Sequence, residues 1–224
     1  MTAPTFAEAG YAISPDILAA EEVGLFLDSL SRVARTRAGA RGLMQLPSVA
    51  ALANGTGLRA LAAEALGGQA VPFKATLFDK SRGANWAVPW HQDAALPLEA
   101  RCEAPGWGPF STKAGVLHAN APAWALDRVV ALRVHLDDSG PDNGPLRVIP
   151  GSHRHGRLDE STLGQIVRAA VPTECHVPRG GVLLMRPLIL HSSPKIGTAA
   201  HRRVLHIEYA DHLALAPGIR LHVA

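Results

Sequence analysis

The first third of the chain carries apolar residues at the spacing of amphipathic helices. Between residues 17 and 33 they recur every three or four positions, which places them on one helical face. A Ser-Pro-Asp sequence at 14–16 is a typical helix start, and residues 35–39 end the run. A second run at 57–66, rich in alanine and leucine, ends at two glycines. The pattern predicts two helices that pack on the outside of a sheet.

From residue 70 onward, short β-rich segments are separated by glycine and proline. The run 180–190 begins with two glycines and is typical of a buried strand, with His191 at its end. A second strand is expected at 204–210, after the His-Arg-Arg sequence of 201–203. Many short strands without an internal repeat predict a mainly β fold with flanking helices, a double-stranded β-helix of the jelly-roll, cupin-like type.

Alternation within residues 128–137 predicts a strand with one apolar and one polar face. Leu132 and Val134 would lie on one side, and Arg133 and His135 on the other. A polar face on a jelly-roll strand is either solvated or lines an interior pocket. Both interpretations remain open for Arg133 and His135.

Residues 94–127 interrupt the pattern of regular elements. The Pro-Gly-Trp-Gly-Pro sequence at 105–109 breaks helix and strand alike, and loops this long in compact domains are usually functional or disordered. Trp107, Phe110 and Trp124 make simple disorder less attractive. We therefore expect residues 94–127 to form a lid over the mouth of a pocket. The alternative is a loop that merely covers the sheet.

Composition agrees with a globular protein. The chain has 224 residues, of which 47% are hydrophobic, and this is enough to bury a full core. We expect a single domain over 1–224, with a helical flank at 1–69 and a jelly-roll core at 70–224. The net charge of +3 arises from 22 basic and 19 acidic residues without a long run of either sign. This distribution argues against a nucleic-acid partner.

Cysteines and hydropathy bear on the compartment. Cys102 and Cys175 lack the paired spacing of a zinc site and fit free thiols in a reducing compartment. The first ten residues lack the basic and apolar regions of a signal peptide, and no apolar run reaches membrane-spanning length. We expect a cytoplasmic protein without a membrane partner that acts on a small molecule. The sequence does not indicate an oligomeric state.

The candidate chemistry lies in the Trp-His-Gln-Asp sequence at 90–93 together with His191. In an extended segment His91 and Asp93 point the same way, and Gln92 points the opposite way. Two imidazoles and a carboxylate leave positions open on an octahedral metal, as in the facial triad of non-haem Fe(II) oxygenases. His-x-Asp alone is weak evidence, and a surface turn is the alternative. The position of His191 at a strand end favours the metal site.

An arginine follows about eleven residues after His191. Arg202 could form a bidentate pair with a carboxylate, as a dicarboxylate that chelates iron at its other end would require. Arg203 is the neighbouring alternative.

Motifs in the same order resemble the phytanoyl-CoA dioxygenase family of Fe(II)/2-oxoglutarate oxygenases over most of the chain. They are Leu-Phe-Asp-Lys at 77–80, Pro-Trp-His-Gln-Asp at 89–93, Asn-Gly-Pro-Leu-Arg-Val-Ile-Pro-Gly-Ser-His at 143–153, and His191-x-Ser193 with Arg202. By this resemblance, His91, Asp93 and His191 would bind iron. Arg202, favoured over Arg203 by the family spacing, would hold the distal carboxylate of 2-oxoglutarate with Ser193.

The resemblance also places other polar residues near the site. The strand 128–137 would lie beside the co-substrate, so Arg133 and His135 either line the site or face water. Lys80 and Asn85 are expected to line the pocket, with a surface-edge role as the alternative for Lys80. Gln92 is expected to fix the local geometry rather than touch substrate. The histidines of 153–155 would lie in a structural loop, outside the ligand set.

The resemblance implies a reaction as well as a site. Fe(II), 2-oxoglutarate and O₂ would hydroxylate an unactivated C–H bond of a small metabolite, with release of succinate and CO₂. Halogenating relatives carry a small residue in place of Asp93, so its presence favours hydroxylation; desaturation and ring formation remain open. One alternative is a cupin-type Zn²⁺ or Mn²⁺ hydrolase or isomerase, which would leave Arg202 without a task. The other is a non-catalytic sensor of metal and 2-oxoglutarate.

Overall fold

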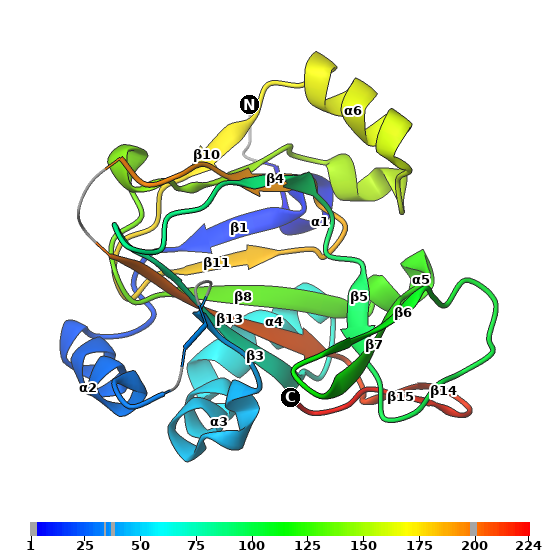
Figure 1. The fold of residues 1–224 in the computed structure, drawn as a ribbon, viewed down its shortest axis with the longest axis horizontal. Coiled ribbons are helices and arrows are strands. Elements are labelled where there is room, and N and C mark those ends of the chain that lie inside the picture. Colours follow the sequence, from blue (N-terminus) through cyan, green and yellow to red (C-terminus); the bar gives the residue numbers. More distant parts are fainter. Residues whose placement is uncertain (1–3, 34, 37–38, 198–200) are drawn as a thin grey trace.

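Antiparallel β-sheets in two layers form the centre of the protein in the computed structural model, which describes residues 4–33, 35–36, 39–197 and 201–224 (Figure 1). The larger sheet contains, in spatial order, β1 (Tyr11–Ser14), β11 (Val182–Met185), β8 (Val129–His135), β13 (Arg202–Ala210), β3 (Val71–Lys80) and β2 (Gly39–Ala40). The smaller sheet contains β10 (Thr173–Cys175), β9 (Leu146–Val148), β12 (His191–Ser193) and β4 (Val88–His91). A cavity lined by residues of both sheets lies between them, which confirms the jelly roll.

The larger sheet has one apolar and one polar face. On β8 and β13, Leu132, Val134, Leu205 and Ile207 point outward into the main hydrophobic cluster. The residues that alternate with them, such as Arg133, point inward toward the smaller sheet. The predicted alternation in residues 128–137 is therefore confirmed, and its polar face is buried rather than solvated.

Helices cover the outer, apolar face of the larger sheet (Figure 1). They are α2 (Ala20–Leu30), α3 (Pro47–Asn54) and α4 (Thr56–Leu66). The helix predicted at 57–66 is confirmed as α4, which ends at Gly67 in the left-handed conformation with φ 74°. Proline at the first position of α3 is a regular helix start, but the sequence pattern did not reveal this helix.

The helix predicted from residue 17 begins later than expected. Residues 11–14 form β1 and pair with β11, so the Ser-Pro-Asp sequence at 14–16 ends a strand instead of starting a helix. The helix α2 starts at Ala20. The Glu22 carboxylate caps this start, because it accepts a hydrogen bond of 2.7 Å from the Ala19 N–H. Residues 1–69 are thus not purely helical.

The run 180–190 is not one continuous strand. Strand β11 ends at Met185, and the chain then crosses from the larger to the smaller sheet, where His191 begins β12. Proline at 187 has no N–H to donate to a neighbouring strand, so it interrupts the strand. Its carbonyl accepts a hydrogen bond of 2.9 Å from the Asp93 N–H. His191 therefore lies at a strand start, and the expected strand end was wrong. The predicted strand at 204–210 is confirmed within β13.

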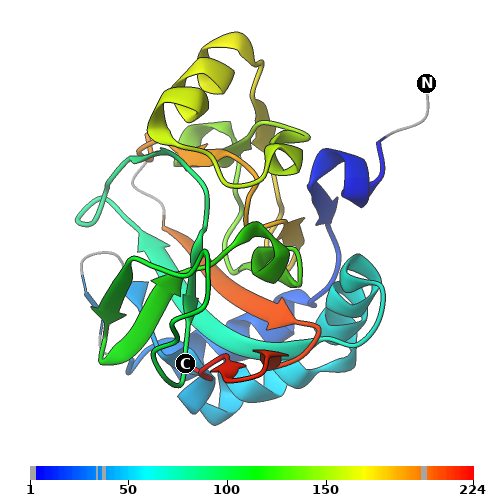
Figure 2. The ribbon, with the colours of Figure 1, turned by 90° about the vertical axis from the view of Figure 1, so that its right-hand side faces the viewer.

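The expectation that residues 94–127 lack regular elements was also wrong. They form a small sheet with the order β5-β7-β6, followed by a short helix (Figure 2). Trp107 and Phe110 pack in a second hydrophobic cluster with the C-terminal hairpin, whereas Trp124 is exposed. The elements are β5 (Ala95–Pro97), β6 (Phe110–Lys113), β7 (Val116–Asn120), α5 (Ala123–Leu126), β14 (Ala214–Ala216) and β15 (Ile219–Arg220). Movement of this segment as a lid stays a prediction.

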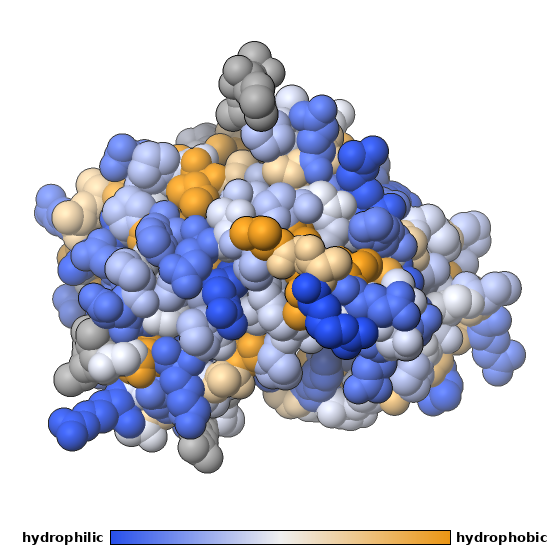
Figure 3. Space-filling model, turned by 90° about the horizontal axis from the view of Figure 1, so that it is seen from above, coloured by the Kyte–Doolittle hydropathy of each residue, from blue (hydrophilic) through white to orange (hydrophobic). Residues whose placement is uncertain are grey.

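The remaining helices lie at the periphery: α1 (Phe6–Ala9), α6 (Glu160–Ala169) and the 3₁₀ turns η1 (Leu43–Gln45), η2 (Pro141–Asn143) and η3 (Ser152–His155). Seen from above, the surface is mainly hydrophilic with small separate hydrophobic patches (Figure 3). Cys102 and Cys175 are free thiols, as predicted. Within the described ranges, no helix has the length and apolar character needed to cross a membrane. The cytoplasmic location stays a prediction.

Candidate active site

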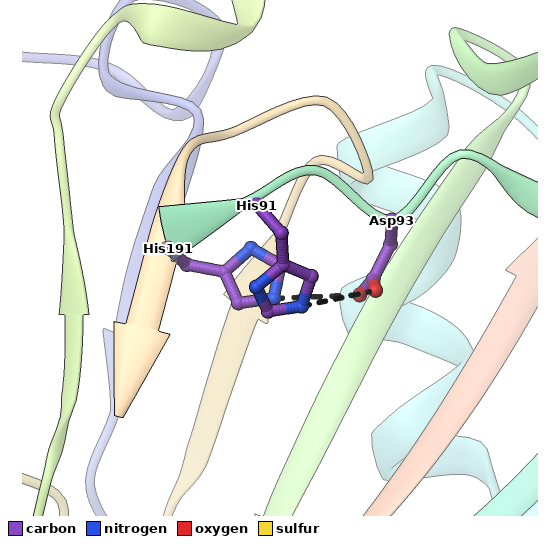
Figure 4. Close-up of side chains that lie close together, drawn as sticks. All are labelled: His91, Asp93 and His191. Carbon is purple, nitrogen blue, oxygen red and sulfur yellow. Dashed lines mark ion pairs between the residues drawn. The ribbon is translucent and has the colours of Figure 1, made fainter. Parts of the chain in front are cut away.

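Two histidines meet on adjacent strands of the smaller sheet. His91 ends β4 and His191 begins β12, and the two residues are direct partners in the antiparallel register. Their ring centroids lie 4.1 Å apart at an interplanar angle of 52°. Asp93 lies just beyond the end of β4, where its N–H bond to the Pro187 carbonyl fixes the backbone. The strand pairing and this bond together bring the three side chains to one point (Figure 4).

The geometry of this cluster suits a metal ion. The Asp93 carboxylate oxygens lie 3.7 Å from His91 Nε2 and 3.6 Å from His191 Nε2. Each imidazole holds its Nδ1 close to a backbone carbonyl, at 2.9 Å from Pro89 for His91 and 3.0 Å from Ile189 for His191. Because a carbonyl only accepts, the proton stays on Nδ1 and the Nε2 lone pair faces the centre. Such a donor set fits a divalent transition metal.

The charge states also suit metal binding. Burial, only partly opposed by Asp93, lowers the pKa of His191 to about 4, so its imidazole is neutral at neutral pH. Burial by itself would raise the pKa of Asp93, but its electrostatic interactions with His191, His206, His91 and Lys74 outweigh it and hold that pKa below its ordinary value. The centre therefore offers the neutral imidazole of His191 and an ionised Asp93 carboxylate.

A cavity of about 100 Å³ lies beside the three residues, between the two sheets. Its wall is partly apolar, with Phe78 and Trp86 near the larger sheet and Val88 and Leu146 on the smaller one. Its polar residues are Lys80, Arg133, Ser193 and Arg202, together with His91, Asp93 and His191 themselves. We call this space the inner cavity.

The inner cavity has a strongly cationic lining. Lys80, Arg133 and Arg202 are 1%, 6% and 3% exposed, and no acidic side chain in the described ranges forms an ion pair with them. Ser193 Oγ accepts hydrogen bonds from Lys80 Nζ at 2.8 Å and from Arg202 Nη2 at 3.0 Å. Lys80 also donates to the Pro194 carbonyl at 2.7 Å, and Arg202 donates to the Gly144 carbonyl. Buried cations without a counter-ion are the expected form of an anion site.

Repulsion within this group is visible in its acid–base behaviour. Burial, followed by the charges of Arg202 and Arg133, lowers the pKa of Lys80 to about 7. Burial and Arg133 lower the pKa of Arg202 to about 9. The Nε atoms of Arg133 and Arg202 are buried, and the described part of the chain supplies neither with a hydrogen-bond partner. A bound anion would relieve both the repulsion and the unsatisfied donors.

The structure separates the two neighbouring arginines of β13. Arg202 points into the inner cavity, whereas Arg203 donates from Nε and Nη2 to the Asp137 carboxylate at 2.8 and 2.7 Å. Opposite faces of one strand account for this difference. Arg202, Ser193, Arg133 and Lys80 thus come together as the sequence suggested, and Arg203 does not join them.

Other expected residues lie elsewhere. Asn85 does not line the inner cavity, because its amide pairs with the backbone N–H and carbonyl of Ile196 at 2.8 and 3.0 Å. His135 is buried, with neither ring nitrogen hydrogen-bonded to a described residue, and it also lies outside the cavity lining. His153 contacts the Ala7 carbonyl at 3.1 Å, away from the three candidate ligands.

Gln92 has the positioning role that the sequence suggested. Its Nε2 donates to the carbonyls of Gly156 and Leu188 at 2.8 Å each, and its Oε1 accepts from the Leu158 N–H at 2.9 Å. These bonds hold Gln92 against two neighbouring loops, and this fixes the backbone between the candidate ligands His91 and Asp93.

A second, larger space shares His91, Asp93 and Phe78 with the inner cavity. We call it the outer chamber; its volume is about 440 Å³. Its further lining residues are Arg41, Lys74, Thr76, Gln92, Ala94, Ala95, Lys113, Asn120, His206 and Glu208. Sequence reasoning missed the polar members from β3 and β13. The signal was present, because His206 and Glu208 alternate with buried apolar residues just as Arg133 does.

A chain of hydrogen bonds joins the two spaces. Arg133 Nη1 in the inner cavity lies 3.1 Å from His206 Nδ1, and His206 Nε2 lies 3.2 Å from Glu208 Oε1. Lys74 Nζ donates to the same oxygen at 2.7 Å. Because a guanidinium only donates, His206 Nδ1 accepts and the ring proton is on Nε2. All four residues lie on the inner face of the larger sheet.

Comparisons with known proteins agree with this architecture. The family model for phytanoyl-CoA dioxygenase (PhyH) matches residues 47–204. A curated relative, L-proline trans-4-hydroxylase of Streptomyces griseoviridis, is 28% identical over 177 residues, which cover 66% of this chain and 58% of the relative. The match therefore spans less than two thirds of that relative's length.

Solved structures share the fold over nearly the whole chain. AviO1 from Streptomyces viridochromogenes Tue57 superposes with a TM-score of 0.69 at 23% identity, covering 95% of this chain and 93% of that one. The epimerase SnoN, in complex with Fe³⁺, alpha ketoglutarate and nogalamycin RO, has a TM-score of 0.73 at 20% identity, with coverages of 93% and 81%. At these identities the likeness shows the fold alone.

Proposed function

The chain belongs to the phytanoyl-CoA dioxygenase family, and from this premise we propose that it is a non-haem Fe(II)- and 2-oxoglutarate-dependent dioxygenase that hydroxylates an unactivated C–H bond of a small metabolite. One observation carries the proposal: a convergent His-Asp-His cluster opens onto a buried cavity lined by cations without an acidic partner in the described ranges. A metal at one end and a carboxylate at the other satisfy both parts of this arrangement.

Each residue has a distinct task in this proposal. His91, Asp93 and His191 hold Fe(II) and leave positions open on it. Arg202 and Lys80, which share Ser193 Oγ, bind the distal carboxylate of 2-oxoglutarate in the inner cavity. The bound iron and 2-oxoglutarate supply an oxidant made from O₂, with release of succinate and CO₂.

The protein's own contribution is position and the exclusion of water. The Nδ1 bonds of both histidines fix the rings, so their Nε2 atoms need no reorientation when a metal arrives. Apolar side chains such as Val88 and Leu146 line the inner cavity beside its buried cations, which strengthens the charge interactions within it. The outer chamber, next to the same His91 and Asp93, provides the space for a substrate.

The cation group favours an oxygenase over the other classes. A Zn²⁺ or Mn²⁺ hydrolase or isomerase would need an activated water and a nearby base, and it would give Lys80, Arg133 and Arg202 no task. A sensor of metal and 2-oxoglutarate would not need the outer chamber. Product analysis under O₂ distinguishes hydroxylation from desaturation and ring formation, which use the same ligand set.

Anaerobic titration tests the proposal. The apo-protein is loaded with Fe(II) and then with 2-oxoglutarate, and the weak visible charge-transfer band of the chelate is recorded. We expect His91→Ala to abolish the band, and Arg202→Ala to require roughly 30-fold or more 2-oxoglutarate, because it removes a buried partner of the carboxylate. Arg203→Ala is the matched control and should titrate like the wild type. A protein that binds metal yet forms no band would refute the assignment.

A further inference from the structure

The outer chamber contains charged residues that the proposed reaction does not use. Apart from Asp93 it is lined by three cations, Arg41, Lys74 and Lys113, and by one acid, Glu208. Glu208 is 6% exposed, whereas Arg41 and Lys113 are exposed. The chamber thus has a buried ion pair in its wall and cations at its rim.

The buried pair is held in a fixed orientation by the sheet. Lys74 and Glu208 are direct partners across β3 and β13, with 2.7 Å between Nζ and Oε1. The same Oε1 accepts the Nε2 proton of His206, whose tautomer is set by Arg133. Two donors on one oxygen keep Glu208 ionised, and its pKa is held below the ordinary value despite burial, which acts to raise it. His206 is therefore a positioning residue for this carboxylate.

Unused hydrogen-bonding capacity remains on both members of the pair. Glu208 Oε2 has no hydrogen-bond partner among the residues that the structure describes, and Lys74 keeps two further N–H donors. Glu208 lines the chamber, so a ligand N–H can donate to this oxygen and form a charge-assisted hydrogen bond. The pair consequently offers one acceptor and two donors, side by side, to a molecule in the chamber.

The rim adds positive charge. In the described ranges, neither Arg41 nor Lys113 forms an ion pair with an acid. Burial, then the charges of Lys74 and Arg41, lowers the pKa of Lys113, which reflects repulsion among these cations. The excess of cations over acids favours a ligand that carries an acidic group.

We propose that the outer chamber is the substrate site and that the substrate is a small α-amino acid, with its ammonium group on Glu208 and its carboxylate on Lys74 and Lys113. This inference rests on the proposed function. An adjacent ammonium and carboxylate on the protein are complementary to the adjacent carboxylate and ammonium of an amino acid. A volume of about 440 Å³ holds such a molecule next to His91 and Asp93, where its C–H bonds meet the metal centre.

Calorimetry without O₂ tests the inference. Protein loaded with Fe(II) and saturating 2-oxoglutarate is titrated with each of the twenty common amino acids. Each amino acid that binds is then compared with its deaminated acid and its decarboxylated amine. We expect at least one amino acid to bind, and both analogues to bind at least tenfold more weakly, since each loses one of the two charge contacts.

Variants assign the two contacts to residues. Glu208→Gln should weaken the amino acid at least tenfold and leave the deaminated acid within about twofold. Lys74→Met and Lys113→Met should weaken both the amino acid and the deaminated acid, and leave the amine nearly unchanged. Lys113 is at the exposed rim, so its variant keeps the test valid if replacement of a buried partner prevents folding. Arg168→Met on the exposed side of α6 is the control and should bind like the wild type.

Two outcomes would overturn the inference. One is that none of the twenty amino acids binds; the other is that binding survives removal of the ammonium or of the carboxylate, or survives both lysine variants. The charge-transfer band of 2-oxoglutarate is recorded on the same samples. A band without amino-acid binding rejects the amino-acid site alone, whereas a missing band rejects the oxygenase assignment itself.

Discussion

The inner cavity and the outer chamber share His91 and Asp93 but hold their cationic side chains in different ways. In the inner cavity, Lys80 and Arg202 are buried and fixed by hydrogen bonds to Ser193 and to backbone carbonyls. In the outer chamber, Lys113 is exposed on the small β5-β7-β6 sheet. The jelly-roll interior thus forms a rigid site for a ligand of fixed shape. Under the proposed function, the wall of the substrate side comes partly from this small sheet, which is separate from the pair of strands β4 and β12 that carries His91 and His191.

Loss of a metal ligand should disable both spaces at once. His191→Ala removes one of the three candidate ligands, and the described residues supply no fourth member of the cluster, so we expect metal affinity to fall more than the roughly 100-fold that loss of a supporting residue costs. The amount of iron that stays bound after desalting measures this loss of metal affinity. His153→Ala is the matched control, because His153 lies outside the cluster. Equal iron content in the two variants would show that His191 is not a ligand.

Removal of one hydroxyl should affect the inner cavity alone. Ser193→Ala takes away the oxygen that Lys80 and Arg202 share, so we expect 2-oxoglutarate to bind about tenfold more weakly, and the free energy of unfolding to fall by about 1–3 kcal/mol. Charge-transfer titration and urea unfolding measure the two effects. Ser192→Ala is the control, since the buried Ser192 Oγ has no hydrogen-bond partner in the described ranges. Similar losses in both variants would contradict the shared-oxygen role.

The affinity for 2-oxoglutarate should depend on pH through Lys80. With its pKa lowered to about 7, Lys80 is half uncharged in the free protein at that pH. A bound dianion favours the ammonium form, so binding takes up a proton above pH 7 and the affinity falls as pH rises, by at most about tenfold per pH unit. Titrations between pH 7 and 8.5 measure the slope, and Lys80→Met should remove it. An unchanged slope in that variant would assign the effect to another group.

The smallest effect is expected in the turn between β6 and β7. Ala114 follows β6 with φ 49°, a left-handed conformation that glycine adopts without the steric cost of a Cβ. Ala114→Gly should therefore raise the free energy of unfolding by about 0.5–1 kcal/mol, and leave 2-oxoglutarate binding unchanged. Thermal unfolding measures this change in stability. Ala100→Gly is the control, and we expect it not to raise the free energy of unfolding. A lower stability of Ala114→Gly would show that the turn is not strained.

The metal cluster was the part of the site most accessible from sequence. Alternation in a strand predicts which neighbours share a face, and this argument put Arg133 on the face opposite Leu132 without deciding between pocket and solvent; in the structure that face points inward. Applied to β13, the same argument would have revealed His206 and Glu208. The meeting of His91 with His191 is different, because it depends on the pairing of β4 with β12 across about a hundred residues. The sequence joined His191 to the cluster through its expected place at a strand end, which was wrong, and through the family resemblance.

The errors in the fold have a common physical origin in long-range pairing. The sequence at 14–16 looks like a helix start, yet residues 11–14 pair with β11 and form a strand that ends there. Proline-rich residues 94–127 look irregular, yet Pro97 ends β5 and Pro109 precedes β6, positions that a sheet tolerates. Local propensity does not report partners that are distant in sequence.

Strand β12 is only three residues long, yet it carries both His191 and Ser193. Residues two apart on a strand point to the same side and lie about 7 Å apart. Under the proposed function, this strand fixes the distance between the iron ligand His191 and Ser193, which helps to bind the distal carboxylate of 2-oxoglutarate. A diacid one methylene shorter would leave one end unbound, and a longer one would have to bend. The length of the co-substrate would then be selected by the backbone, because the rise of the strand sets the distance between residues 191 and 193.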